Sequence, residues 1–238
     1  MPEHLLLRLE APLMSFGTTA VDHRRPVQPW PATSMLTGLL GNALGWTALQ
    51  TAALDGLQSR LRWAARIDRP GTPLNDFQTA RLNADDKAWT TRGRIEERGG
   101  GENTYKAPHL RYRDYRADAS VLVAVRLDPA ENTPTLADIA IALDRPARPL
   151  FIGRKNCPPA TRIAIGIVEA ADAVAALDEA PSAEADIPPE HAAVYFNEGA
   201  SERTTNLRVH MTSDERRFAL DVHAGRQRVY ERPARIAP

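Results

Sequence analysis

The chain has 238 residues, with 30 Lys or Arg and 30 Asp or Glu, so its formal net charge is zero. A balanced charge argues against a protein that coats nucleic acid through bulk electrostatic attraction. A single cysteine excludes an intrachain disulfide and a cysteine-based zinc site, and no apolar stretch is long enough to predict a membrane-spanning helix. Since the first residues have the pattern of a strand rather than of a leader peptide, we expect a soluble cytoplasmic protein.

The first expected elements are a strand and a helix. Leu5, Leu7 and Leu9 occupy alternate positions, as on the buried face of a half-buried strand. After a polar connection, Thr33 or Ser34 is expected to cap a helix, because hydroxyl side chains favour the position before the first turn. The free amides of that turn form an anion site in principle, although the two hydroxyls can equally serve only as caps.

The same helix carries three glycines on the side opposite its leucines, at Gly38, Gly41 and Gly45. Inside a helix each glycine costs about 1 kcal/mol relative to alanine. We therefore expect a close neighbour, either RNA or another protein, to lie against this side.

The middle of the chain predicts three strands and a second helix. Strand patterns occur at residues 62–67, 77–82 and 120–127, and Thr135 is expected to cap a helix that ends near Leu143. The order β-α-β-β-α-β predicts an α+β, ferredoxin-like fold of the kind found in RNA-recognition domains, provided that one of the two middle strands is peripheral. We expect residues 1–82 and 120–170 to form this domain.

Residues 83–119 form an excursion that is too long for an ordinary connection, which predicts a role of its own. Interleaved cations and aromatic rings suit single-stranded RNA, because cations meet phosphates and rings stack on bases. An insertion without function is the alternative. The cations include Arg92, Arg94, Arg98, Lys106, Arg111, Arg113 and Arg116, and the rings are Trp89, Tyr105, Tyr112 and Tyr115.

Residues 148–159 form a proline-flanked segment that we call the elbow. Apolar residues anchor its start, Gly153 permits a backbone conformation closed to other residues, and the prolines prevent a helix afterwards. Arg154, Lys155 and Asn156 project from it, and these residue types suit a phosphate and a base edge. Residues 145–162 carry five cations and no acidic residue, although a solvated basic loop would have the same composition.

The last part of the chain is expected to be a small β-rich domain, residues 171–238. Residues 162–168 have a strand pattern, residues 171–177 a helix pattern, and residues 180–190 the composition of a linker. We expect residues 203–212, 217–222 and 226–231 to form a small antiparallel sheet, in which the last two segments pair.

Three segments together resemble a known family. Ile152-Gly153-Arg154-Lys155-Asn156-Cys157-Pro158 is similar to the Leu-Gly-Arg-Arg-Ser-Cys-Pro motif of CasD-type subunits of the type I-E CRISPR surveillance complex, Cascade, in the RAMP superfamily. Residues 7–17 resemble the opening strand and loop of that family, and residues 25–41 resemble its first helix. Similarity is weaker at residues 75–79 and 114–120 and is slight beyond residue 170.

The resemblance implies a non-catalytic subunit that binds the 5′ handle of the CRISPR RNA and caps the Cascade backbone. Residues 83–119 would be a thumb that closes over the guide. The implied partners are CRISPR RNA, the backbone subunits, the large subunit and, through the complex, target DNA, with no metal, cofactor or membrane. The expected RNA-binding residues are Ser15, Phe16, Gly17, Arg25, Thr33, Ser34, Arg94, Tyr105, Lys106, Arg111, Gly153, Arg154, Lys155, Asn156 and Cys157.

Two other functions stay open. Tyr105, Lys106 and His109 could cleave RNA without a metal, with His109 as general acid or base and Lys106 stabilising the transition state. The resemblance makes this relevant, because type I-C relatives process the guide precursor with Tyr, Lys and His, whereas type I-E relatives leave that cut to a separate subunit. A structural subunit that only joins protein neighbours is the third possibility.

Overall fold

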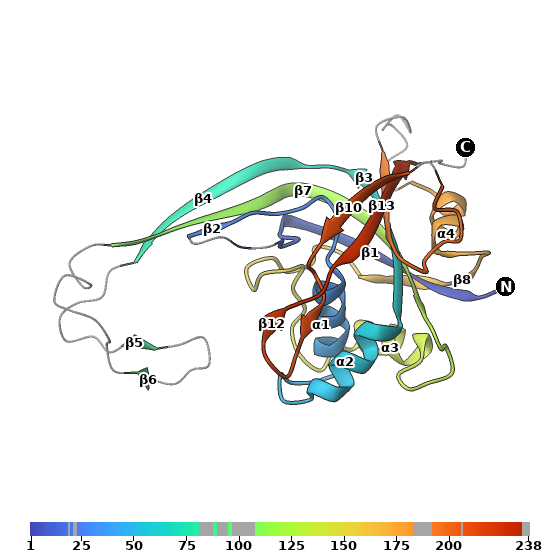
Figure 1. Ribbon diagram of the computed structural model, residues 1–238, viewed down its shortest axis with the longest axis horizontal. Helices are drawn as coiled ribbons and strands as arrows, with labels where there is room; N and C mark the ends of the chain where they lie inside the picture. Colours follow the sequence, from blue (N-terminus) through green and yellow to red (C-terminus); the bar gives the residue numbers. More distant parts are fainter. Residues whose placement is uncertain are drawn as a thin grey trace.

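A large, mostly antiparallel sheet and four helices make up the described part of the protein. The computed structural model describes residues 1–18, 20, 23–80, 88–89, 95–96, 108–182, 192–205 and 207–234. The sheet contains, in spatial order, β10 (Arg208–Thr212), β13 (Gln227–Pro233), β9 (Ala193–Asn197), β3 (Leu61–Arg69), β7 (His109–Leu127), β1 (Glu3–Met14) and β8 (Ala164–Glu169). The chain thus forms a mixed α/β fold, as expected (Figure 1). None of the helices in the described part of the chain has the length and apolar character needed to span a membrane.

The first two-thirds of the chain supply the centre of the sheet and three helices. In chain order these elements are β1 (Glu3–Met14), α1 (Thr33–Ala43), α2 (Thr51–Arg60), β3 (Leu61–Arg69), β7 (His109–Leu127), α3 (Leu136–Asp144) and β8 (Ala164–Glu169). Strands β3, β7, β1 and β8 are neighbours in that order, and each pair is antiparallel. Thr135 caps α3, as predicted, through a reciprocal pair of hydrogen bonds with Asp138.

Apolar residues cover both faces of the sheet. Leu5, Leu7 and Leu9 of β1 belong to the core cluster that includes α1, α2 and α3. Leu6 points the other way and packs in a second cluster with Leu177 of α4 (Ala173–Glu179). Strand β1 is therefore buried on both faces, and the expectation of a half-buried strand was wrong because α4 covers the second face.

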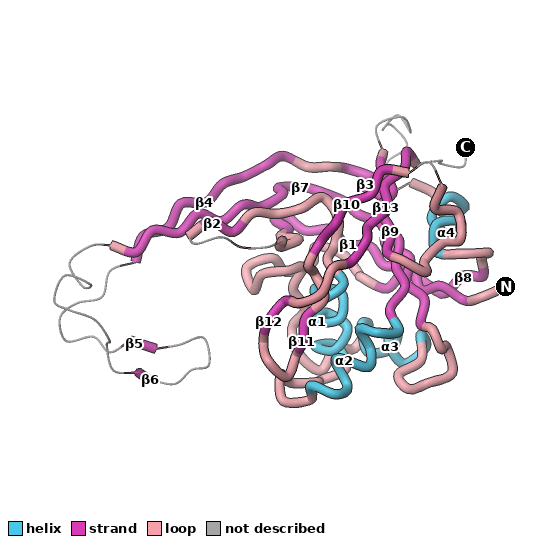
Figure 2. The backbone as a smooth tube through the Cα atoms, in the orientation of Figure 1, coloured by secondary structure: helices cyan, strands magenta, loops and turns pink. Residues whose placement is uncertain are grey.

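Strand β7 is much longer than expected and extends beyond the core. Its residues 120–127 pair with β3, and its residues 109–117 pair with β4 (Thr72–Ala80). The two middle strand candidates thus lie end to end along β7. On the other edge of β7, β2 (Arg24–Arg25) pairs with Tyr112 and Arg113. We call β4 with residues 109–117 the arm; Figures 1 and 2 show it projecting away from the helices, with β2 alongside.

Gly71 and Asp118 mark the junction between the core and the arm. Both have a positive φ, of 65° and 56°, and a Cβ atom on Gly71 would lie 2.5 Å from the carbonyl oxygen of Ala117. The close approach lies where the pairing of β7 changes from β3, whose pairing ends at Ser120, to β4, whose pairing begins at Ala117. Beyond the arm, the short strands β5 (Ala88–Trp89) and β6 (Ile95–Glu96) pair with each other.

Three of the C-terminal strands extend the main sheet, and two short ones form a separate two-stranded sheet. Strand β9 (Ala193–Asn197) pairs with β3, and β13 (Gln227–Pro233) lies between β9 and β10 (Arg208–Thr212). The expected pairing of residues 217–222 with residues 226–231 was wrong. Residues 218–221 form the turn between β11 (Arg216–Arg217) and β12 (Val222–His223), with Asp221 at a φ of 57°.

Gly41 allows α1 and α2 to pack closely. A Cβ atom at this position would lie 2.7 Å from Cδ2 of Leu54, whereas one on Gly38 would have no heavy atom within 4 Å. The close neighbour of Gly41, which we expected to be another molecule, is the chain's own α2.

Candidate nucleic-acid interface

The elbow is a tight loop whose two ends are anchored in the core. The backbone N–H of Ile152 donates to the carbonyl of Cys157 at 2.7 Å, and the N–H of Cys157 donates to the carbonyl of Arg154 at 2.9 Å. Ile152 and Cys157 are fully buried, while Lys155 and Asn156 are exposed. The short hydrogen-bonded turn therefore holds the polar tip outside while its base stays in the core.

The elbow rests directly on the end of β1. Gly153 has a φ of +93°, and a Cβ atom there would lie 1.9 Å from the carbonyl oxygen of Ser15. The N–H of Ser15 donates to the carbonyl of Ile152 at 3.2 Å. Ser15 and Phe16 are buried, so the ring of Phe16 offers no surface to a base, and of the three expected loop residues only Gly17 is exposed.

Arg154 connects the elbow to the arm. Its Nη1 donates to the carbonyl of Asp114 at 2.9 Å and its Nη2 donates to the carbonyl of Arg25 at 3.0 Å. Its guanidinium carbon lies 4.6 Å from the centre of the Tyr115 ring, within the range of a cation–π contact. Two of the five N–H donors of this arginine thus hold the chain's own backbone. Arg154 therefore has a structural role as well as a charge: it acts as a brace, by which we mean that it holds the elbow against the arm.

Asn156 is tethered from both ends of its carboxamide. Its Nδ2 donates to the hydroxyl of Tyr115 at 2.9 Å, and Sγ of Cys157 lies 3.8 Å from its Oδ1. Burial raises the pKa of the Cys157 thiol, so at neutral pH this thiol stays protonated and can donate to that oxygen. A buried, protonated thiol is a poor nucleophile, and because the Cys157 side chain is fully buried it packs in the core rather than facing RNA.

Lys155 is the exposed cation of the elbow. No hydrogen bond or ion pair joins its side chain to another residue within the described ranges. Because successive residues of a strand alternate between its faces, Arg111 and Arg113 share one face of β7 with Tyr115, over which Arg154 lies. Asp76 lies opposite Arg113 in β4 and offsets part of its charge.

The opposite face of the arm carries exposed aromatic rings. Phe77 lies opposite Tyr112, with ring centres 5.0 Å apart, and the His23 ring lies 5.6 Å from Tyr112. Phe77 is 52% exposed although it is a large apolar residue. Phe77 was not among the expected site residues, because only the pairing of β4 with β7 brings it next to Tyr112.

The predicted anion site at the start of α1 is already filled by the chain. The N-cap is Ala32 rather than Thr33 or Ser34, and no side chain caps it. The N–H of Thr33 donates to Oδ2 of Asp214 at 3.1 Å, and the Thr33 hydroxyl donates to Gln227 at 2.9 Å. Thr33 is buried, so the expectation that it binds an external anion was wrong. Burial is the main cause that raises the pKa of Asp214 to about 6.

Part of the predicted site lies outside the described residues, namely Arg94, Tyr105 and Lys106. His109 begins β7 as an exposed residue opposite Ala80, and Arg111 is exposed with its Nη1 on the carbonyl of Leu110. Of the three residues considered for RNA cleavage, Tyr105, Lys106 and His109, only His109 therefore has a described position. Among the residues with described positions, no three His, Cys, Asp or Glu side chains are placed to hold a metal ion.

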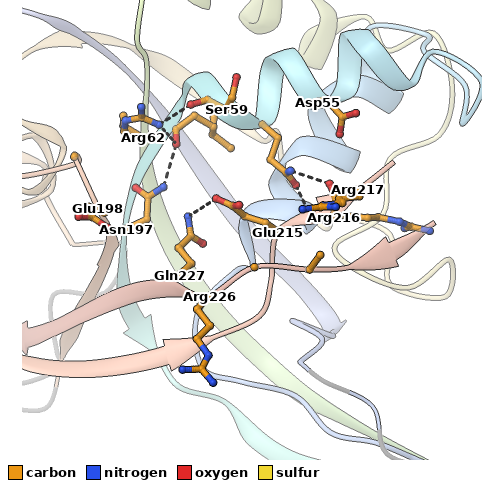
Figure 3. A pocket seen from close by; sticks show the side chains of 15 residues that line it. Asp55, Ser59, Arg62, Asn197, Glu198, Glu215, Arg216, Arg217, Arg226 and Gln227 are labelled. Carbon is orange, nitrogen blue, oxygen red and sulfur yellow. Dashed lines mark hydrogen bonds between the residues drawn. The ribbon is translucent and has the colours of Figure 1, made fainter. Parts of the chain in front are cut away.

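A polar cavity of about 580 Å³ lies between α2, the start of β3 and the C-terminal strands. Most of its polar groups bind the chain itself: the carboxamide of Gln58 exchanges two hydrogen bonds with the backbone of Arg216, and Gln227 donates to Glu215. In Figure 3 the side chains of Arg217 and Arg226 point away from each other. The hydrogen bonds along this cavity thus hold the C-terminal strands on α2, and the cations that line it do not converge on one point.

Comparisons with known proteins match this arrangement. The sequence matches the family described as "CRISPR-associated protein (Cas_Cas5)" over residues 4–230. It is 29% identical over 178 residues to the CRISPR system Cascade subunit CasD of Escherichia coli (strain K12), covering 74% of this chain and 76% of that protein.

Two solved structures have the same fold. One, titled "CRISPR RNA-guided surveillance complex", gives a TM-score of 0.71 at 27% identity and covers 98% of this chain and 90% of the other. The second, titled "Crystal structure of Cas protein", gives a TM-score of 0.63 at 27% identity and covers 98% and 97% of the two chains. The resemblance to CasD-type subunits is confirmed, and the chain belongs to the CRISPR-associated Cas5 family.

Proposed function

We propose that this protein is a non-catalytic subunit of a type I-E Cascade complex that binds the 5′ handle of the CRISPR RNA in antiviral defence. In this role it caps one end of the backbone, next to the large subunit, and meets target DNA only through the complex. The family match and the likeness to CasD support the setting in a surveillance complex. We expect this complex to work in the cytoplasm.

The observation that carries the proposal is the fixed elbow with its exposed tip. A loop that is tied to β1 at Gly153 and to the arm at Arg154 presents Lys155 and Asn156 without having to become ordered on binding. Such preorganisation avoids the loss of chain entropy that weakens binding by flexible loops. Lysine then meets a phosphate as a point charge, and the carboxamide of Asn156 meets the edge of an unstacked base.

The other expected residues divide into direct contacts and supports. Arg111, Arg25 and Gly17 are exposed and available to the RNA backbone. Ser15, Phe16 and Cys157 are buried and instead hold the elbow, and Arg154 serves mainly as a brace. Arg94, Tyr105 and Lys106 remain proposed contacts at the end of the arm, and Ser34, half-buried in the first turn of α1, remains a proposed contact as well.

We assign β1, α1, β3, β7, α3 and β8 to a ferredoxin-like RAMP core made from residues 1–82 and 120–170. The strand order β3-β7-β1-β8, with α1 and α3 in one cluster, supports this assignment. Residues 83–119 are the proposed thumb, of which the last residues are the β7 half of the arm. Residues 171–238 are the proposed C-terminal part, whose strands extend the same sheet.

The direct test is binding of a repeat-derived RNA by the purified chain in the presence of EDTA. We expect intact RNA to be retained, with affinity concentrated in the 5′ handle sequence. Cleavage that is lost in His109→Ala would favour the endoribonuclease instead, and absence of any RNA binding would favour a subunit that only joins proteins.

A further inference from the structure

Tyr115 does not have the role that its place in the aromatic arm suggests. It was expected among the rings that stack on RNA, but it is only 1% exposed. It lies on β7, opposite Leu74 of β4, and points towards the elbow. A ring that is fully covered by its own chain is unavailable to a base, so its contacts must explain why a tyrosine stands there.

Those contacts hold both neighbours of Lys155. The ring of Tyr115 lies beneath the Arg154 guanidinium, and its hydroxyl accepts a hydrogen bond from Nδ2 of Asn156. Arg154 also bonds to the carbonyl of Asp114, the residue before Tyr115. One short stretch of the arm therefore sets the position of the elbow on either side of its exposed cation.

The two ends of the Asn156 carboxamide have different partners. The Cys157 thiol is a hydrogen-bond donor and so faces Oδ1, while the hydroxyl of Tyr115 accepts from Nδ2. If the carboxamide rotated by 180°, its N–H donor and its oxygen acceptor would exchange places. Base edges differ in their pattern of donors and acceptors, so the two orientations would select different bases. With Tyr115 and Cys157 bound, the Asn156 carboxamide still has one N–H on Nδ2 and one lone pair on Oδ1. These two groups are held in a fixed arrangement at the tip of the elbow.

We propose that Tyr115 is a positioning residue that fixes the carboxamide of Asn156 in the orientation that reads a base of the bound RNA. This inference rests on the proposed function and adds to it a source of base selectivity. Tyr115 itself touches no RNA. The Tyr115 hydroxyl and the Cys157 thiol together set which donor and acceptor Asn156 presents, and the Tyr115 ring holds Arg154 in place.

The test is the selectivity of Tyr115→Phe, which keeps the ring under Arg154 and removes only the hydroxyl. Affinity is measured for a synthetic RNA with the repeat-derived 5′ handle sequence and for an RNA of the same length with the bases permuted. We expect the ratio of the two affinities to fall about 3- to 10-fold, as the loss of one oriented hydrogen bond implies. The affinity for the permuted RNA and the salt dependence should stay unchanged, because no charge is removed.

Two further variants complete the test. Asn156→Ala should reduce the ratio to the same extent, and the double variant should show no further loss, since the two groups act as a unit. Tyr230→Phe, which removes the hydroxyl of a buried tyrosine in β13, is the matched control and should retain the wild-type ratio.

The proposal is overturned if Tyr115→Phe retains the wild-type ratio, or if it weakens both RNAs in parallel, as general loosening of the elbow would. If Lys155→Ala weakens RNA binding while Tyr115→Phe retains the wild-type selectivity, the proposed function is supported and only the role of Tyr115 is refuted. If the wild-type protein does not prefer the handle sequence over the permuted RNA, both the proposed function and the role of Tyr115 are refuted.

Discussion

Gly153 lies so close to Ser15 that a Cβ atom on the glycine would come within 1.9 Å of the serine carbonyl oxygen. No side chain fits between the elbow and the end of β1, and the φ of +93° also favours glycine. The contact joins two segments that are more than a hundred residues apart in sequence and that both resemble the family motifs. It fixes the place of the elbow on the sheet.

Replacement of Gly153 by alanine should therefore displace the elbow. We expect a loss of about 1–3 kcal/mol in the free energy of unfolding, the range for a strained backbone position, together with weaker RNA binding. Urea denaturation measures the first effect. Gly38→Ala is the control, because a Cβ atom there meets no heavy atom within 4 Å, and it should raise stability by up to about 1 kcal/mol. Equal stability of the two variants would refute this account of the elbow.

Lys155 and Arg154 should respond differently to truncation. Lys155→Ala removes an exposed cation, so we expect unchanged stability, weaker binding of every RNA sequence, and a salt slope reduced by about 0.7. Arg154→Ala removes two hydrogen bonds and a cation–π contact, so it should also lower the free energy of unfolding by about 2 kcal/mol. Arg228→Ala, an exposed arginine of β13, is the control for general charge. Arg154→Ala and Lys155→Ala with identical stability would contradict the assignment of Arg154 as a brace.

Phe77 should contribute to binding without contributing much to folding. Its ring is 52% exposed and packs at a tilt against Tyr112, so Phe77→Ala should cost about 1–3 kcal/mol of RNA binding, the range for one stacked base. The thermal midpoint should change little. Leu74→Ala, at an exposed apolar position on the other face of β4, is the control. RNA affinity equal to wild type in Phe77→Ala would show that this face of the arm does not meet RNA.

Asp214 should make stability depend on pH. Its pKa is raised by burial to about 6 in the folded protein, above the ordinary value of 3.8, so the folded state binds the proton more tightly than the unfolded state. Its contribution to stability is therefore complete below about pH 4 and is lost as the pH rises through 6, on the order of 2–3 kcal/mol in total.

Asp214→Asn should remove this component, so that wild type loses stability relative to the variant between pH 4 and 7. Chemical denaturation at a series of pH values measures the difference. Glu198→Gln, at an exposed carboxylate, should run parallel to wild type. A wild-type protein that gains stability relative to Asp214→Asn over this interval would show that burial does not control the titration.

Local sequence patterns predicted which secondary-structure elements form better than they predicted what packs against those elements. The alternating leucines of β1, the Thr135 cap and the elbow were visible in the sequence, because each depends on residues a few positions apart. The second buried face of β1 was not visible, because α4 and Leu6 come together only in the folded chain.

The site shows the same division. Residue types and the family resemblance indicated Arg154, Lys155 and Asn156 as a projecting tip. Lys155 and Asn156 are exposed, whereas Arg154 is half-buried against Tyr115. The filled start of α1 could not be predicted, since Asp214 follows Thr33 by 181 residues. Likewise, the covering of Tyr115 by Arg154 depends on the long strand β7 reaching the elbow.

The most direct test of the account is photo-crosslinking of thiouridine-labelled CRISPR RNA in the assembled complex, followed by mapping of the modified peptides. The account predicts adducts in residues 150–159, formed with the 5′ handle and lost in Gly153→Ala. Efficient crosslinks to other parts of the chain, with residues 150–159 unmodified, would contradict it.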